Sequence, residues 1–191
     1  LLATPITSVL TWIPTYLQRI HGMSIADSGM SLGLMLFFLS STGVIFGGWL
    51  VDYMKRRDYL DSYFRVGLIV CIASVPLILF ATSLADLQTT IFVLCPFIFI
   101  VSMPLAVGPI VLQVITPNQL RAQVAAVYML FLNLLTALLG PTGIGLVTDY
   151  FFKNDLAIGQ SITLINLIST PLAFIFLYFG LIHFNKRLTN S

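Results

Sequence analysis

The sequence predicts an all-α membrane protein that crosses the bilayer six times. The chain has 191 residues, of which 58% are hydrophobic and only 8% are charged, whereas soluble domains carry about 25% charged residues. The apolar residues also fall into six runs, each long enough for the roughly 20 residues that span a hydrocarbon core. This composition excludes an ordinary soluble domain, and a net charge of +2 gives no reason to expect a nucleic-acid partner.

Short polar segments separate the runs and set the expected limits of each helix. Ser24 or Asp27 can cap the second helix. Before the fifth helix, Thr116 suits the cap position and Pro117 the first helical position. The expected spans cover residues 1–17, 27–54, 63–82, 88–115, 120–149 and 158–184. The chain opens at Leu1 directly into an apolar run, so we expect it to be a fragment of a longer protein.

The distribution of cations predicts the orientation of the helices. The second run ends at Asp52 and is followed by three consecutive cations. Because cations collect on the cytoplasmic side of membranes, we place this loop and the C-terminus inside the cell. Alternating spans then put seven cations inside, namely Lys55, Arg56, Arg57, Arg65, Arg121, Lys186 and Arg187, and two outside, Arg19 and Lys153.

Small residues and prolines predict where helices pack and bend. Gly33, Ser40 and Gly47 recur every seven residues, so they share one face on which a second helix can approach closely. Proline removes a backbone donor and kinks a helix. We therefore expect hinges at Pro104, Gly108 and Pro109 in the fourth helix, and a break at Gly140-Pro141 in the fifth.

The sequence Gly48-Trp49-Leu50-Val51-Asp52-Tyr53 has a counterpart 97 residues later, Gly145-Leu146-Val147-Thr148-Asp149-Tyr150. Both copies read Gly-x-x-x-Asp-Tyr, and both end a long apolar run. The first copy is expected at the inner membrane surface and the second at the outer surface. An inverted repeat of three plus three helices leaves this pattern in a sequence.

These residues resemble the major facilitator superfamily of transporters. Gly48, Asp52, Arg56 and Arg57 match its cytoplasmic-loop motif, although Tyr53 and Lys55 replace a usual basic residue and a usual glycine. Three further stretches are similar to bacterial Spinster-like members. They are Trp12-x-Pro14-Thr15-Tyr16, Thr116-Pro117-Asn118-x-x-Arg121-Ala122 and Gly140-Pro141-x-x-x-Gly145-x-x-x-Asp149.

The resemblance implies that residues 1–191 form the C-terminal half of a twelve-helix transporter of the bacterial inner membrane, whose N-terminal half is absent here. It implies secondary active transport by alternating access, with a lipid-like or amphipathic organic anion or an organic acid as substrate. Asp52 and Arg121 would belong to the conformational motif, and Asp52 would brace the other half when the cytoplasmic side is closed. The alternatives are an ordinary exposed acid at Asp52, and a non-transporting sensor or scaffold with the same fold.

Chemistry inside the expected spans is restricted to neutral polar groups. Candidates for lining a cavity are Thr11, Trp12, Tyr16, Ser102, Gln113, Asn133 and Thr136. Serine and threonine hydroxyls often bond their own helix instead, and Asn133 can bond a neighbouring helix. No catalytic motif, metal-ligand spacing or cofactor motif is present, so we expect no enzyme, metal or cofactor. No ionisable residue lies mid-span, so any proton-coupling group belongs to the missing half or lies near a membrane surface.

Overall fold

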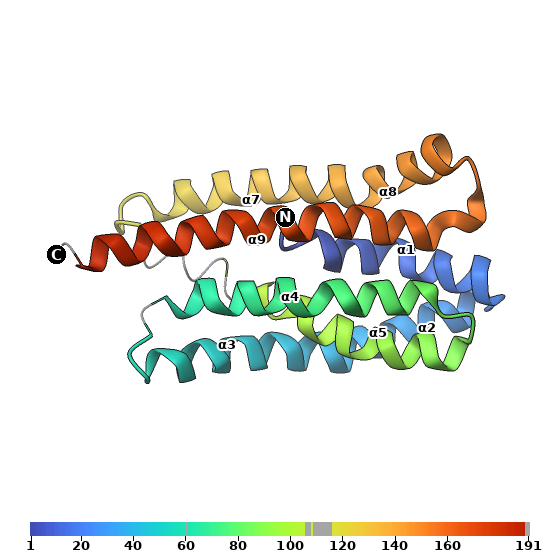
Figure 1. The fold of residues 1–191 in the computed structure, drawn as a ribbon, viewed down its shortest axis with the longest axis horizontal. Helices are drawn as coiled ribbons and strands as arrows, with labels where there is room; N and C mark the ends of the chain where they lie inside the picture. The colour runs from blue at the N-terminus through green and yellow to red at the C-terminus, as the bar shows by residue number, and fades with distance from the viewer. Residues whose placement is uncertain (60, 106–107, 109–115, 190–191) are drawn as a thin grey trace.

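The computed structural model describes residues 1–59, 61–105, 108 and 116–189, with the side chains of the last helix described to residue 182. Every regular element assigned in these residues is a helix, which confirms the all-α prediction for this part of the chain. The helices run along a common long axis and form one elongated bundle (Figure 1).

The first half of the chain contains four helical rods. α1 covers Thr4–His21. The second rod is continuous over 31 residues and joins α2 (Ile25–Met35), a π-helical segment η1 (Leu36–Ser40) and α3 (Ser41–Lys55). α4 covers Ser62–Ser83 and α5 covers Leu87–Ser102.

The second half contains two long rods. The first is continuous over 32 residues and joins α7 (Arg121–Ala137), η2 (Leu138–Thr142), α8 (Gly143–Leu146) and η3 (Val147–Phe152), where η2 and η3 are π-helical. A short 3-10 turn η4 (Asp155–Ala157) leads into α9 (Ile158–Thr189). The α1–α2, α4–α5 and η3–α9 connections lie at one end of the bundle, and the α3–α4 connection and the C-terminus lie at the other (Figure 1).

The described helices begin and end within about five residues of the expected limits, except that α5 ends at Ser102, well before the expected end at residue 115. Four of the described helical rods are long and apolar enough to cross a membrane: Ile25–Lys55, Ser62–Ser83, Arg121–Phe152 and Asp155–Ile182. α5 is apolar but has only 16 residues. α1 has 18 residues and is more polar because it carries several threonines and two prolines. The predicted span to residue 115 extends into 106–107 and 109–115, outside the described residues.

The helix starts show which local signals were interpreted correctly. Ser24 caps α2, because its side-chain oxygen accepts from the Asp27 N–H at 3.1 Å. The prediction of Thr116 as a cap is wrong, because α7 begins only at Arg121 and the N–H of Leu120 closes a turn to the Pro117 carbonyl at 3.0 Å. Pro117 therefore lies in the turn before the helix instead of in its first turn.

α1 lies in the interior of the bundle and supplies much of its core. Val9, Ile13 and Leu17 of α1 are 1%, 0% and 0% exposed and join one apolar cluster with residues of α4, α5 and α9. The predicted small-residue face is confirmed in part, since a Cβ at Gly47 would lie 2.7 Å from the Met103 carbonyl oxygen, whereas nothing lies within 4 Å of one at Gly33. Close packing thus holds α3 on α5.

Candidate functional site

The hydroxyl groups of α1 bond mainly to their own helix. The Ser8 hydroxyl donates to the Thr4 carbonyl at 2.8 Å, and the Thr11 hydroxyl donates to the Thr7 carbonyl at 2.6 Å. This is the usual way for a hydroxyl to satisfy its donor within an apolar helix. Each hydroxyl oxygen keeps its acceptor capacity, and Thr11 is exposed, so it remains able to accept a hydrogen bond from a ligand.

Trp12 connects α1 to the π-helical segment η2. Its indole N–H donates to the Pro141 carbonyl at 3.1 Å. A Cβ at Gly140 would lie 2.7 Å from the Thr7 hydroxyl, so glycine allows the two helices to touch here. The helix does not break at Gly140-Pro141 as expected; it widens into a π-turn and continues. Proline removes one helical donor, whose acceptor would lie about one turn earlier, and the indole bond to the Pro141 carbonyl joins η2 to α1.

A small groove of about 230 Å³ opens between α1 and α7 beside this contact. Of its polar side chains, Thr11 and Asn133 are exposed and Thr136 is buried. Asn133 donates to the Met129 carbonyl at 2.7 Å but is exposed, and the Thr136 hydroxyl donates to the Leu132 carbonyl at 2.7 Å and is 6% exposed. The residues that line the groove are Thr7, Leu10, Thr11, Asn133, Thr136, Ala137 and Pro141.

The groove offers hydrogen bonds and no charge. None of the described residues that line it is Asp, Lys, Arg or His, so a ligand would be recognised by the neutral donors and acceptors of these residues. Among the described residues, no group of three or more His, Cys or acidic side chains is placed to hold a metal ion. Cys71 and Cys95 are both unbridged, and Cys71 is buried.

Two of the predicted cavity residues lie elsewhere. Tyr16 is 1% exposed in the core, and its hydroxyl donates to the Ala81 carbonyl at 3.2 Å. Ser102 is fully buried and donates to the Ile98 carbonyl at 2.7 Å. Both therefore stabilise the bundle instead of lining the groove. Gln113 lies outside the described residues.

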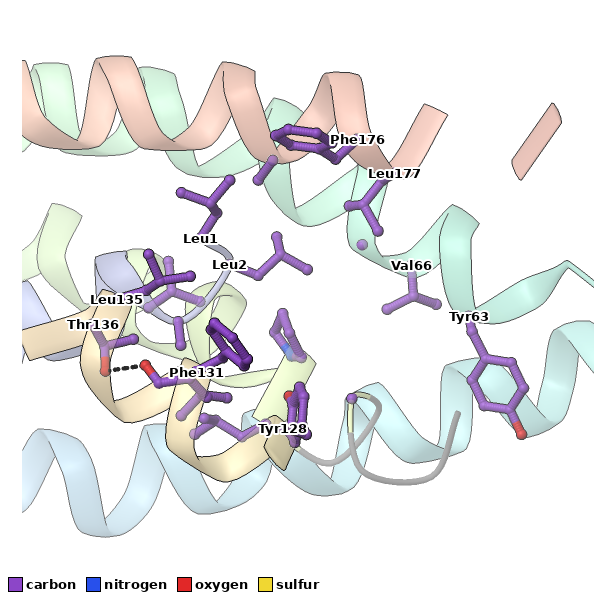
Figure 2. Close-up of a pocket in the computed structure, with 18 of the residues that line it drawn as sticks. Leu1, Leu2, Tyr63, Val66, Tyr128, Phe131, Leu135, Thr136, Phe176 and Leu177 are labelled. Carbon is purple, nitrogen blue, oxygen red and sulfur yellow. Dashed lines mark hydrogen bonds between the residues drawn. The ribbon is translucent and has the colours of Figure 1, made fainter. Parts of the chain in front are cut away.

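A second and larger cavity of about 640 Å³ lies between the start of α1 and helices α4, α7 and α9 (Figure 2). Leu1, Leu2, Phe131 and Phe176 project toward it, and nearly all of its lining is hydrocarbon or aromatic. Thr136 lines both this cavity and the polar groove. Such a lining suits an apolar chain or a further helix, and offers little to fix a polar solute.

The predicted conformational motif lies at the end of α3 and is exposed. Among the described residues Asp52 forms no ion pair, and Arg56, one turn later on the helix, is not its partner. The Lys55 ammonium instead contacts the Tyr63 hydroxyl, and the Arg57 guanidinium lies 4.9 Å from the Tyr53 ring centroid. Nothing lies within 4 Å of a Cβ built at Gly48. Among the described residues at this end of the bundle, Lys55, Arg56 and Arg57 form no ion pair, although Asp52 and Asp58 lie near them in the sequence.

The repeat counterpart lies at the opposite end of the bundle. Asp149 is exposed in η3 (Figure 1), and a Cβ at Gly145 would lie 3.4 Å from the Trp12 ring. Arg121 donates to the Thr116 carbonyl at 3.2 Å and thereby closes the turn before α7. The predicted hinge at Pro104 lies outside α5, because this helix ends at Ser102, two residues before the proline.

Two further observations concern that hinge. A Cβ at Gly108 would lie 2.6 Å from the Tyr128 hydroxyl, so glycine permits a close approach to α7. Pro109 lies outside the described residues. The end of α5 is tightened by an N–H of Met103 that donates to the Ile100 carbonyl at 3.2 Å, a spacing of three residues.

A polar cluster at the other end of the bundle was not predicted. His21 Nε2 lies 3.4 Å from the Tyr16 hydroxyl, and burial lowers the pKa of His21 while the Asp86 carboxylate partly opposes this. Asp86 caps α5, and its hydrogen bonds from the Thr89 hydroxyl and N–H lower the Asp86 pKa. The sequence signal for this cluster was weak, because Tyr16 and His21 of α1 are far along the chain from Asp86, which precedes α5.

The comparisons with known proteins give one partial likeness. The chain is 33% identical over 54 residues to "Uncharacterized transporter YybO" of Bacillus subtilis (strain 168). That match covers 28% of this chain and 12% of the relative. No family model matches the chain, and no solved structure matches it. The chain is thus a helical membrane protein with a distant, partial similarity to a transporter.

Proposed function

We propose that residues 1–191 form one six-helix half of a secondary transporter of the major facilitator superfamily, and that this transporter moves a small organic or amphipathic solute by alternating access. The observation that carries the proposal is the polar groove between α1 and α7, on a side of the bundle that the chain itself leaves open. In the apolar 18-residue stretch of the α7 rod, only 6% of the residues are buried. A solute cavity between two halves needs such a wall.

The chain would be the C-terminal half, with an N-terminal half that completes the cavity. Gly48 and Asp52 end one rod at one end of the bundle, and Gly145 and Asp149 end another rod at the opposite end. This arrangement supports an inverted repeat of three plus three helices. The cation-rich end would be cytoplasmic in a bacterial inner membrane, because Lys55, Arg56 and Arg57 collect there.

The groove residues have separate roles in the proposal. Thr11 and Asn133 contact the solute, and Trp12 holds the wall together through Pro141. Since the groove has no ionisable side chain, a charged solute or a coupling proton would be met by the other half. Asp52 and Arg121 would adjust the balance between the two open states, and Pro104, Gly108, Pro109, Gly140 and Pro141 would allow helices to bend.

The experiment compares two matched threonines in the complete transporter. Thr11 and Thr42 are both exposed, and each donates to the carbonyl four residues earlier at 2.6 Å, but only Thr11 lines the groove. We expect Thr11→Val and Asn133→Ala to raise the KM for solute uptake into vesicles about tenfold, as one lost hydrogen bond of roughly 1.4 kcal/mol would. Thr42→Val should leave KM unchanged.

Two outcomes would contradict the proposal. Equal KM values for all three variants would show that the solute does not bind in the groove. Saturable uptake by residues 1–191 alone would show that no second half is needed. A non-transporting sensor or scaffold is the second candidate, favoured by the absence of an ionisable group in the groove, and it predicts ligand binding by the complete protein without uptake.

A further inference from the structure

Aromatic rings form a continuous stack along the outer face of α3. The ring centroids of Phe46 and Trp49 lie 5.3 Å apart, and those of Trp49 and Tyr53 lie 5.4 Å apart with an interplanar angle of 19°. The Arg57 guanidinium extends the stack, 4.9 Å from the Tyr53 centroid. We call these four residues the α3 ladder. The spacing of three and four residues keeps them on one face of the helix.

Most of the α3 ladder lies outside the packed side of the helix. Phe46, Trp49 and Tyr53 are 38%, 54% and 41% exposed. Phe46 also contacts Phe99 of α5, with ring centroids 5.5 Å apart, so it lies at the edge of the packed surface. The opposite side of α3 supplies the main packing, where Gly47 fits against Met103 and Val51 packs near Val66. Trp49 and Tyr53 therefore face whatever surrounds the protein, with Phe46 partly exposed beside them.

The ladder lies at the end of a membrane span. The apolar rod ends at Lys55, so Tyr53 and Trp49 occupy the depth at which amphipathic rings gather at a membrane surface. Phe46 lies seven residues before Tyr53, or about 10 Å deeper at 1.5 Å per residue. The ladder thus extends from the headgroup region into the hydrocarbon.

The cations at the end of the ladder nearest the membrane surface form no ion pair among the described residues. All seven Asp residues of the chain lie in the described part, and the two ion pairs found there use Arg19 and Arg65. Lys55, Arg56 and Arg57 therefore form none, although the exposed Asp52 and Asp58 leave the local net charge at only +1. Guanidinium groups bind phosphate through paired hydrogen bonds.

We propose that the α3 ladder binds an anionic phospholipid. Arg56 and Arg57 hold the phosphate, and one acyl chain lies along Trp49 and Phe46. The charge pattern selects this occupant. A lipid phosphate pairs with both arginines directly, whereas a protein surface over the ladder would have to supply acids of its own, because burying an unpaired charge is costly. The inference depends on membrane insertion and not on transport.

A photo-crosslinking experiment in vesicles tests the site. The complete protein carries p-benzoylphenylalanine at Ile45, which is 71% exposed one turn before Trp49, in vesicles of equal phosphatidylglycerol and phosphatidylethanolamine. The control label replaces Phe92 of α5, which is 78% exposed and far from the cations. Mass spectrometry gives the ratio of the two lipid adducts at each position.

We expect the phosphatidylglycerol ratio to be roughly fivefold higher at position 45 than at 92, since one surface cation contributes about 1 kcal/mol. Arg56→Gln with Arg57→Gln should remove the difference, and Arg19→Gln should leave it. High salt should also remove it in the unsubstituted protein, which guards against a misfolded variant. Equal ratios at the two positions would overturn the proposal, and so would crosslinks at 45 to protein instead of lipid.

Discussion

The pair α4–α9 and the rod α7–η3 are both apolar but differ in how far the chain buries them. The mean hydropathy is 2.3 for α4 and 1.9 for the α7 rod. In an apolar 18-residue stretch of each, 39% of the residues of α4 are buried but only 6% of those of the α7 rod. α4 and α9 meet through small residues, since a Cβ at Gly67 would lie 2.8 Å from Leu177 and one at Gly180 would lie 2.8 Å from Phe64.

The α7 rod has few such contacts, and those that hold it to α1 lie near η2, at Gly140 and Pro141. Hydropathy therefore predicts that a segment enters the membrane, but the placement of small residues decides whether it packs inside the bundle. A helix that is apolar and nevertheless open is available to lipid or to another part of the protein. Three changes test this contrast.

The largest effect is expected from one substitution made on the two faces of α3. Gly43→Ala would place a methyl group against the Phe99 carbonyl oxygen, whereas nothing lies within 4 Å of a Cβ at Gly48. Because overpacking costs about 1–3 kcal/mol, Gly43→Ala should lower the free energy of unfolding by this amount. Gly48→Ala should be neutral or slightly stabilising.

Denaturant unfolding in detergent micelles measures both variants. If Gly48→Ala destabilises the protein as much as Gly43→Ala, the outer face of α3 is not open, and the contrast between packed and open surfaces fails at this helix.

A smaller effect is expected at the attachment of the α7 rod. Trp12→Phe removes the bond from the indole N–H to the Pro141 carbonyl, and a hydrogen bond contributes about 0.5–1.5 kcal/mol. We expect amide hydrogen exchange over residues 138–146 to become faster while exchange in α4 stays unchanged. Trp49→Phe is the matched control, since Trp49 is 54% exposed. Faster exchange throughout the bundle would instead make Trp12 a general core residue.

The smallest effect is a pH dependence at the end of the bundle that holds the α1–α2 and α4–α5 connections. Burial lowers the pKa of His21 below its ordinary value of 6.5, so the folded state disfavours the charged ring. Stability is then full above pH 6.5 and falls as the pH drops through 6.5 toward the lowered value. The melting temperature in detergent should decrease between pH 8 and pH 5, and His21→Gln should weaken this decrease.

Asp86→Asn sharpens the test because it keeps a capping side chain but removes the carboxylate that partly opposes the shift. The pKa of His21 should fall further, and acid should then destabilise the protein more than before. A pH dependence that is the same in all three proteins would assign it to other groups.

Several helix limits lie close to those expected from the sequence, because hydropathy and loop polarity are local properties. The spans over Ile25–Lys55 and Ser62–Ser83 differ from the expected limits by two residues or fewer at each end. The start of α7 was wrong because Thr116-Pro117 suits a helix cap and a turn equally well. Local signals alone do not distinguish the two.

The faces of the helices were harder to predict than their limits. Thr11 and Asn133 line the groove, but Tyr16 and Ser102 have similar polarity and are buried. Their placement depends on neighbours far along the chain, such as the Ala81 carbonyl that accepts from Tyr16. The bond between Trp12 and Pro141 joins residues 129 positions apart, and no spacing rule within one helix could have found it.

The π-turn η2 allows its rod to hold an additional residue without changing which faces point toward α1. Each residue of an α-helix turns the chain by about 100°, as 3.6 residues per turn require, but a π-turn takes up one more residue within a single widened turn. Deleting one residue within 138–142 would therefore restore regular α-helical winding while Asn133 and Gly145 kept their directions. Deleting one residue from the regular part of α7 would instead rotate everything after it by about 100° and turn Gly145 away from Trp12.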